Sequence, residues 1–307
     1  MSMMHLPANL EAGLATWTDD TARMWLSDLP VRMSEAEERW GVTIGEPFQP
    51  GGATSYVAPA TAADGRRMVY KCTIPHDEAI GEAHALRAYE GNGAVLLHAD
   101  HATTFELLVE RCEPGVSLWS EPDDVRMEVT CELMKRLWRS EADGQLVVLK
   151  DLTSKWAGIT ERRMITIEVP WITGPIERGV ELLGALPASA AADVLLHQDL
   201  HPGNVLSSAR ESWLVIDPKP VVGDPAFDPV QLLVQVDGRV AEPPGPDVVI
   251  ERLERIAAFL ALDPERLGLW ALARCAEWSM WSYERGRTID AAIEYTWART
   301  LDAIFPP

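Results

Sequence analysis

The sequence predicts an α+β fold in which a small β-rich part precedes a larger, mainly helical part. Short β-branched segments broken by turn residues fill residues 42–112, whereas helical spacing of apolar residues dominates after Pro114 and Gly115. A chain of 307 residues is near the size limit of a single core. We therefore expect two domains, residues 1–112 and residues 113–307.

The first 40 residues are predicted to be helical. Asp19 and Asp20 precede Ala22, Trp25 and Leu29, whose spacing places them on one buried face. A short N-terminal helical region should therefore lead into the first strand near residue 42.

The β-rich part is predicted to contain five strands and one helix. Turn residues separate the first three strands, at Pro50-Gly51-Gly52 and at Asp64-Gly65. The expected strands lie within residues 42–48, 53–60, 67–74, 94–100 and 103–112, and the helix spans 76–89.

The second part is predicted to be helical with one β interruption. Helical spacing covers residues 128–140 and 172–186, and three more helices follow residue 247. The short strands lie within residues 194–206 and 212–220, and polar residues gather there.

Composition excludes several classes of protein. With 27 Lys and Arg against 47 Asp and Glu, the net charge of −20 would repel nucleic acid and favours a cationic partner. There is no apolar run long enough to span a membrane and no recognisable signal peptide. The four cysteines are far apart without a CxxC pair, which indicates reduced thiols. We expect a cytoplasmic monomer or dimer.

The strongest chemical signal is the segment HQDLHPGN, followed by an aspartate at the end of the next apolar strand. In a phosphoryl-transfer site, a loop carboxylate orients the acceptor hydroxyl and takes its proton. An amide five residues on and a carboxylate on the next hairpin can hold magnesium. This pattern assigns Asp199 as the catalytic base and Asn204 and Asp217 as metal ligands.

Two other interpretations of this segment remain open. Asp199 and Asn204 could simply cap backbone amides in a polar turn. Alternatively, His197, Asp199 and His201 alternate, so on a strand they would point the same way and could bind a metal directly, as in a metallohydrolase.

The upstream half offers residues for nucleotide phosphates. The loop that contains Gly51, Gly52, Thr54 and Ser55 could cover phosphates with its backbone amides, although many Gly-Gly hairpins are only turns.

Lys71 lies within an apolar strand, where its charge needs an anionic partner. A helix glutamate could hold this lysine toward the phosphates. Glu78 and Glu82 are both available, and we favour Glu82 because it should lie nearer the middle of the helix. Lys71 could also project into water from an edge strand.

These residues carry a resemblance to a known family. The segments GGATSYV, VYKC, GEAHALRAYEGNGAVLLH, LLVERCEPG and IDPKPVVGDPAFD resemble the aminoglycoside phosphotransferase group of the protein-kinase-like fold. Within that group the chain is most similar to the streptomycin 6-kinase and hydroxyurea-resistance kinase family. The similarity extends over roughly residues 45–285.

The resemblance implies a bilobal kinase that uses ATP and Mg²⁺ to phosphorylate a hydroxyl of a small molecule, with streptomycin or a related aminoglycoside as the expected acceptor. It also implies that the backbone of Glu110–Cys112 meets adenine. Two alternatives remain. The kinase could act on hydroxyurea or another small metabolite, or the protein could bind nucleotide without catalysis. The chain departs from the family at Trp138, where a histidine is usual.

A cationic acceptor would need acidic and aromatic groups near the catalytic loop. A guanidinium stacked on tryptophan and paired with glutamate is a strong recognition mode. Asp228 could instead cap a helix, a structural role that we favour, and the helix residues could belong to the core. The candidates are Asp224, Asp228, Glu277, Trp278, Trp281 and Glu284.

Overall fold

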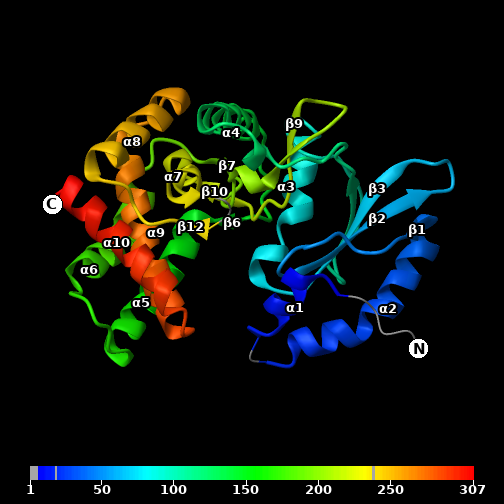
Figure 1. The fold of residues 1–307 in the computed structure, drawn as a ribbon, viewed down its shortest axis with the longest axis horizontal. Coiled ribbons are helices and arrows are strands. Elements are labelled where there is room, and N and C mark those ends of the chain that lie inside the picture. Colours follow the sequence, from blue (N-terminus) through cyan, green and yellow to red (C-terminus); the bar gives the residue numbers. More distant parts are fainter. Residues whose placement is uncertain (1–5, 18, 237–238) are drawn as a thin grey trace. The chain divides into compact units, whose positions relative to one another are not determined.

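A computed structural model describes residues 6–17, 19–236 and 239–307, which form two compact units (Figure 1). The first unit extends to Gly115 and also takes in Ser207–Leu214, and the second contains the rest of the chain. Sequence reasoning placed the boundary at residue 112 and did not assign 207–214 to the first unit. Arg210 explains that assignment, because its guanidinium donates to the Glu110 carboxylate and to the Gly91 and Ala94 carbonyls.

The first unit is built on a five-stranded antiparallel sheet in the order β1-β2-β3-β5-β4. The five expected strands are confirmed, with bounds that differ from the expected ones by at most about four residues; the largest difference is at the end of β1, which stops at Ile44. The elements of this unit are α1 (Ala8–Leu14), α2 (Thr21–Trp40), β1 (Val42–Ile44), β2 (Ser55–Ala62), β3 (Arg67–Thr73), α3 (Glu82–Tyr89), β4 (Leu97–His101) and β5 (Glu106–Glu110).

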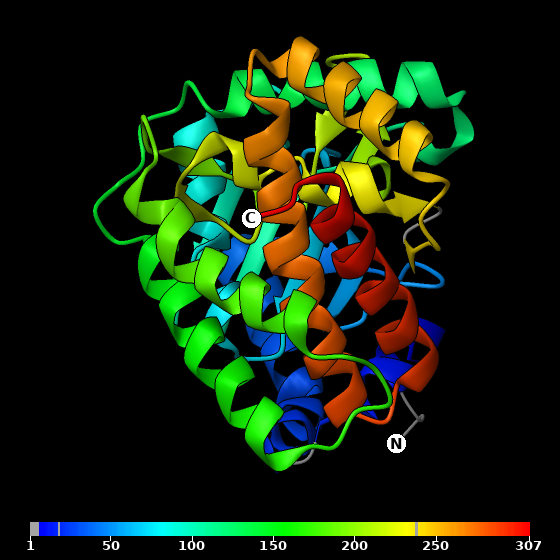
Figure 2. The same cartoon turned by 90° about the vertical axis from the view of Figure 1, so that its left-hand side faces the viewer.

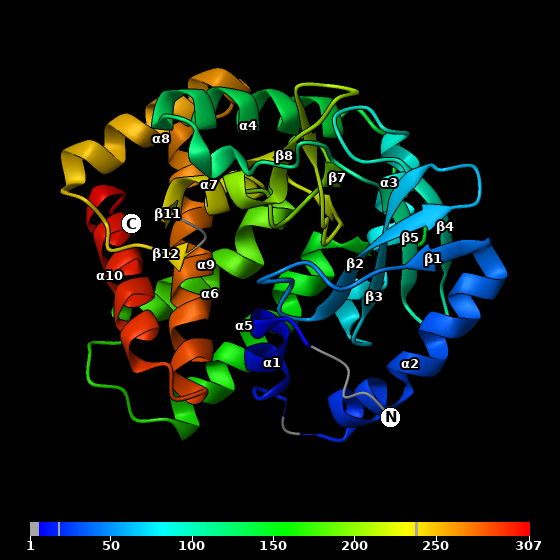
Figure 3. The same ribbon diagram turned by 45° about the vertical axis from the view of Figure 1, so that its right-hand side comes forward.

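Helix α2 packs along one face of this sheet, as Figure 3 shows. Its buried residues include Trp25 and Leu29, as the spacing predicted, and they join Tyr70 and Cys72 of β3 in one core cluster. Since side chains alternate along a strand, Lys71 lies on the face of β3 opposite to Tyr70 and Cys72. The sheet therefore uses one face for its core with α2 and directs Lys71 away from it.

The helix expected over residues 76–89 is shorter than the spacing suggested. A 3-10 turn covers Asp77–Ala79, and the α-helix begins only at Glu82, directly after Gly81. Glycine is a poor helix former, which accounts for the interruption. Glu82 thus lies in the first helical turn, not near the helix middle.

The second unit is mainly helical, and the three helices expected after residue 247 are confirmed. Its elements are α4 (Asp123–Leu137), β6 (Val147–Val148), α5 (Leu149–Thr166), α6 (Gly174–Ala188), β7 (Val194–Leu196), β10 (Val221–Gly223), α7 (Val230–Val234), β11 (Gln235–Val236), β12 (Arg239–Val240), α8 (Pro246–Leu260), α9 (Pro264–Glu284) and α10 (Thr288–Ile304). Strands β8 (Val205–Ser207) and β9 (Trp213–Val215) cross the boundary between the units, because Ser207–Leu214 belongs to the first. Helix α9 is central and packs against α5, α6, α8 and α10 (Figure 2).

Small β elements in the second unit position the polar segments. Strand β10 pairs with β6 and β7, and Val221 lies opposite Leu196 at the end of β7. The hairpin of β8 and β9 then places Asn204 and Asp217 at its base, because the Ile216 amide donates to the Asn204 carbonyl. Within the described residues, the helices are all too short or too polar to cross a membrane.

Candidate active site

The loop that follows β7 is held from beneath by one buried carboxylate. The side chain of Asp228 is fully buried and accepts hydrogen bonds from the backbone amides of His197 (3.2 Å) and Gln198 (2.7 Å). The indole Nε1 of Trp138, the residue after α4, donates a third at 2.9 Å. Burial raises the pKa of Asp228, while these three N–H donors favour its charged form. Asp228 therefore fixes the backbone immediately before Asp199.

His197 locks the same loop to the following hairpin. Its Nε2 donates to the Ile216 carbonyl at 3.0 Å, and its Nδ1 accepts from the Asp199 amide at 3.3 Å. Burial lowers the pKa of His197 to about 3, so the ring is neutral. Gln198 and Asp217 adopt positive φ values of 68° and 58°, a conformation that costs non-glycine residues free energy and recurs at functional sites.

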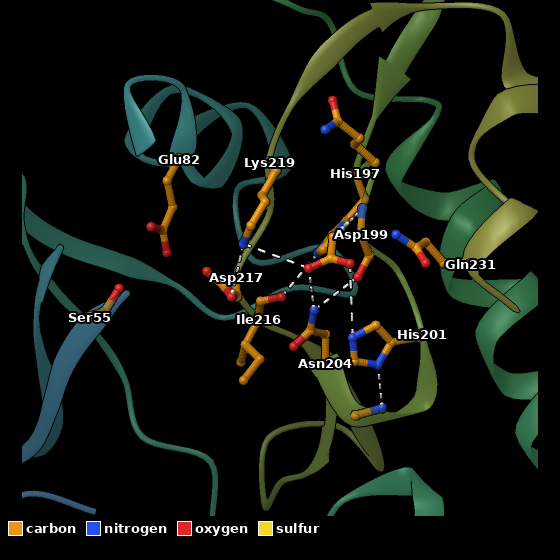
Figure 4. Close-up of polar contacts among 12 residues, drawn as sticks. Ser55, Glu82, His197, Asp199, His201, Asn204, Ile216, Asp217, Lys219 and Gln231 are labelled. Carbon is orange, nitrogen blue, oxygen red and sulfur yellow. Dashed lines mark hydrogen bonds and ion pairs between the residues drawn. The ribbon is translucent and has the colours of Figure 1, made fainter. Parts of the chain in front are cut away.

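Asp199, Asn204 and Asp217 converge at this point of the second unit (Figure 4). The Asn204 side-chain amide donates to the Asp199 carbonyl at 2.8 Å and lies 3.5 Å from its carboxylate. The ammonium of Lys219 lies 3.2 Å from Asp217 Oδ2 and 3.6 Å from Asp199 Oδ2. The side chains of Asp199 and Asp217 are 24% and 37% exposed, so both remain accessible to a ligand.

The arrangement of Asp199, Asn204 and Asp217 does not match the two alternative interpretations of this segment, a polar turn and a metal site built from His197, Asp199 and His201. Strand β7 ends at Leu196, so His197, Asp199 and His201 do not alternate along a strand. Both ring nitrogens of His197 bond to the backbone, and Nδ1 of His201 accepts from the Gly203 amide. Over residues 6–17, 19–236 and 239–307, the structure contains no group of three His, Cys, Asp or Glu side chains suited to a metal ion.

The donor atoms present fit magnesium, which prefers oxygen ligands. Asp217 offers a carboxylate. The Asn204 amide is oriented by its own Nδ2–H bond to the Asp199 carbonyl, which directs its oxygen away from that bond. These two side chains are therefore the residues that would hold the ion.

In the first unit, the glycine-containing loop is braced by the N-terminal helix. The Asn9 amide and side chain donate to the carbonyls of Pro50 and Gly51, both at 3.0 Å. Gly51 has a φ of 75°, and an added Cβ would lie 2.5 Å from Pro7, so only glycine fits there. The hydroxyl of Ser55, a residue predicted to bind nucleotide, is buried against the Thr73 hydroxyl at 2.9 Å.

The structure pairs Lys71 with Glu82 and not with Glu78. The Lys71 ammonium lies 2.6 Å and 2.7 Å from the two Glu82 carboxylate oxygens, and both side chains are buried. The partner is the one that the sequence favoured, although the reason differs, because Glu82 lies in the first turn of α3. A buried ammonium held by both oxygens of one carboxylate has a fixed direction.

The segment compared with an adenine-binding hinge follows β5 in the same unit. The Glu110 carboxylate accepts from the Leu96 amide at 3.0 Å and from the Arg210 guanidinium at 2.9 Å, so its side chain is engaged within the protein. Burial raises the pKa of the Cys112 thiol to about 12, which makes it unreactive near neutral pH. The Glu110 carboxylate is therefore not free to bind a ligand.

Of the acidic residues after β10, Asp224 is as deeply engaged as Asp228. Its carboxylate accepts from Arg266 Nε and from Trp270 Nε1, both at 2.6 Å, and from the Ala226 amide at 3.0 Å. With Asp224 only 3% exposed, binding an acceptor there would require these bonds to break.

Helix α9 carries the remaining acceptor candidates, and arginines of the chain already contact them. Arg274 lies between the rings of Trp156 and Trp278, 3.7 Å and 4.6 Å from their centroids, and its guanidinium bonds to Glu277 at 2.9 Å. Arg274 and Glu277 are buried, whereas Trp156 and Trp278 are half-buried, so the ion pair lies in the interior and the two rings at its edge.

The other end of α9 is more open. Arg163 of α5 pairs with Glu284, whose side chain is 47% exposed, at 2.8 Å. Exposed Arg285 and Arg287 lie over Trp281, with Cζ 4.8 Å and 5.3 Å from the ring centroid. A guanidinium stacked on this tryptophan is therefore sterically possible.

Sequence reasoning missed the parts played by three residues. Trp138 was noted only as a departure from the family, Lys219 received no role, and Arg274 was not considered. Only Lys219 had a local signal, since it lies between two prolines directly after Asp217. Trp138 and Arg274 meet partners that the chain brings together only on folding.

The fold is that of the aminoglycoside phosphotransferases and choline kinases. Aminoglycoside phosphotransferase APH(4)-Ia, solved with ADP and hygromycin B, superposes with a TM-score of 0.64 over 89% of this chain and 97% of that one, at 16% identity. Choline kinase LicA from Streptococcus pneumoniae gives 0.62 over 89% and 98%, at 14% identity. An N-terminal antiparallel sheet followed by a mostly helical region is thus confirmed.

The chain belongs to the aminoglycoside/hydroxyurea antibiotic resistance kinase family, whose model matches residues 39–286. It is 32% identical to the streptomycin 6-kinase of Streptomyces griseus, over 97% of both chains. It is also 32% identical to the hydroxyurea phosphotransferase of Kitasatospora aureofaciens, over 93% of this chain and 82% of that one. The protein is therefore a phosphotransferase, as the resemblance implied.

Proposed function

We propose that this kinase transfers the γ-phosphoryl group of ATP to a hydroxyl of an aminoglycoside, with streptomycin as the first candidate. The observation that carries the proposal is the convergence of Asp199, Asn204 and Asp217 on one loop and hairpin. The streptomycin kinase relatives and the ADP complex of APH(4)-Ia support the acceptor and the nucleotide.

Each residue then has a distinct task in the transfer. Asp199 accepts the proton of the acceptor hydroxyl as its oxygen attacks the γ-phosphorus. Asn204 and Asp217 would hold Mg²⁺, which supplies charge neutralisation on the phosphates when it is bound. Lys71, held by Glu82, is assigned to the phosphates, the loop from Gly51 to Ser55 covers them, and the Glu110–Cys112 backbone meets adenine.

The exposure of the side chains on α9 indicates which of them could contact the acceptor. Trp281 and Glu284 are the pair that an incoming guanidinium could reach, because only exposed arginines cover Trp281 and Glu284 is half-exposed. Three buried carboxylates and one half-buried tryptophan would instead support the site: Asp224, Asp228, Glu277 and Trp278. The net charge of −20 favours encounter with a polycation. Hydroxyurea is uncharged and would gain nothing from these groups.

The first experiment measures ADP release with ATP and Mg²⁺ against streptomycin, hygromycin B, hydroxyurea and choline. The phosphate on the product is located by mass spectrometry and NMR. We expect streptomycin to give the highest kcat/KM. Turnover with hydroxyurea and not with either aminoglycoside would contradict the acceptor assignment while leaving a kinase.

The second experiment tests the base. Asp199→Asn removes the proton acceptor and should lower kcat by about 1,000-fold. Binding of ATP, measured by calorimetry, should change by no more than about threefold. Asp193→Asn is the matched control, because Asp193 is exposed just before β7. Near-normal turnover in Asp199→Asn would overturn the assignment of the site.

A further inference from the structure

Lys219 occupies a fixed position beside the proposed catalytic groups. It lies between Pro218 and Pro220, which restrict φ on both sides and force Lys219 itself into an extended conformation. Its backbone amide donates to the His197 carbonyl at 3.0 Å, which ties it to the loop that carries Asp199. The backbone of Lys219 is thus fixed relative to the loop that carries Asp199.

The ammonium lies between the two carboxylates of the site. Its distances are 3.2 Å to Asp217 and 3.6 Å to Asp199, and Figure 4 shows all three side chains directed toward one another. The side chain of Lys219 is only 21% exposed. Removing most of the water around an ammonium is costly without anionic partners, and two are present here.

An ion pair of Lys219 that served only the stability of the fold would not need to lie beside accessible carboxylates. Asp199 and Asp217 remain partly exposed, whereas the carboxylates that brace this region, Asp224 and Asp228, are buried. Lys219 therefore lies beside two carboxylates that remain accessible to a ligand. An ammonium acts as a compact point charge with three donors, which suits a phosphoryl group that moves during reaction.

We propose that Lys219 is a catalytic residue that contacts the γ-phosphoryl group during its transfer. This inference rests on the proposed roles of Asp199 and Asp217. The bond between the γ-phosphorus and the β,γ-bridging oxygen breaks, and ADP leaves with its electron pair. A bond forms from the acceptor oxygen to phosphorus, and the hydroxyl proton goes to Asp199. Throughout, Lys219 offsets the negative charge on the three non-bridging oxygens.

The test compares Lys219→Met with Lys219→Arg, with exposed Lys150→Met as the matched control. Lys219→Met keeps the length of the side chain and removes its charge. We expect its kcat to fall by about 100-fold or more, with recovery of about tenfold in Lys219→Arg. The melting temperature should stay within about 3 °C of the parent.

A binding measurement separates phosphoryl contact from a structural role. By calorimetry, Lys219→Met should bind AMP-PNP several-fold more weakly than the parent and bind ADP equally well, because only AMP-PNP carries a γ-phosphoryl group. Equal loss for both nucleotides, or a kcat within about threefold of the parent, would overturn the proposal.

Asp199→Asn, assayed in parallel, distinguishes this proposal from the one on which it rests. If Asp199→Asn loses turnover and Lys219→Met keeps it, only the role of Lys219 is wrong. If Asp199→Asn itself keeps turnover, the proposed site is wrong.

Discussion

The region beneath the catalytic loop and the region between α9 and α10 each bury a carboxylate, and they stabilise it in different ways. Asp228 has three N–H donors within 3.2 Å. Glu294 of α10 is 5% exposed, and within the described residues its Oε2 has no hydrogen-bond partner. Burial raises the pKa of Glu294 to about 7. A buried carboxylate with three N–H donors can stay charged and order a loop, whereas one with an unpartnered oxygen takes up a proton more readily.

The proposed catalytic residues and the acceptor candidates on α9 also differ in whether the protein itself occupies their side chains. Asp199 and Asp217 lie on backbone fixed by neighbours, and their own oxygens remain accessible. On α9, Glu277 and Trp278 have a guanidinium of the chain itself as their partner. Residue type and spacing predicted a ligand-binding role in both regions. The accessibility of the side chain is therefore what separates a candidate ligand-binding group from a structural one.

Among the substitutions that test the comparison of these two regions, Asp228→Asn should have the largest effect. The variant keeps the shape of the side chain but places an NH₂ group against N–H donors of the loop and of Trp138. We expect a loss of about 4 kcal/mol in the free energy of unfolding, together with a fall in kcat of about 100-fold at a temperature where the variant stays folded. Urea denaturation measures the free energy of unfolding and the ADP-release assay measures kcat, with Asp193→Asn as control. If stability and turnover both stay unchanged, Asp228 does not order the loop.

The next effect concerns Glu294→Gln and depends on pH. Since the folded-state pKa is raised from 4.5 to about 7, the contribution of this group to stability is full below pH 4.5 and is lost as pH rises through 7. Glu294→Gln should match the parent near pH 4.5 and be more stable by up to about 3 kcal/mol at pH 8.

Urea denaturation at several pH values measures this difference. Glu251→Gln, at an exposed position of α8, is the matched control and should show no such dependence. A constant difference between Glu294→Gln and the parent at all pH values would contradict a protonated Glu294.

The smallest effect should come from Trp138→Phe, which removes one of the three donors to Asp228 and keeps an aromatic ring. We expect a loss of about 1–2 kcal/mol and a drop in kcat of a few-fold. Trp138→His should recover part of both because imidazole can donate a hydrogen bond to Asp228. If the phenylalanine variant outperforms the histidine variant in both measurements, packing and not the hydrogen bond explains Trp138.

Much of the site could be predicted from local sequence. The polar segment between two apolar strands placed Asp199, Asn204 and Asp217 near one another, because a short loop and a hairpin leave few other arrangements. The five strands of the first unit followed from alternating apolar residues and turn residues. The helix at 76–89 was predicted too long because Gly81 interrupts a spacing that otherwise looks continuous.

The sequence by itself determined which chemical groups this protein carries and where the chain turns between them, since both depend on residues close together along the chain. Only the tertiary structure decided which polar and charged side chains are paired within the protein. Trp138 and Asp228 are 90 residues apart, and Arg163 and Glu284 are 121 apart. Such pairs form because buried polar groups must find partners once packing excludes water, and no local pattern records which partner packing will supply.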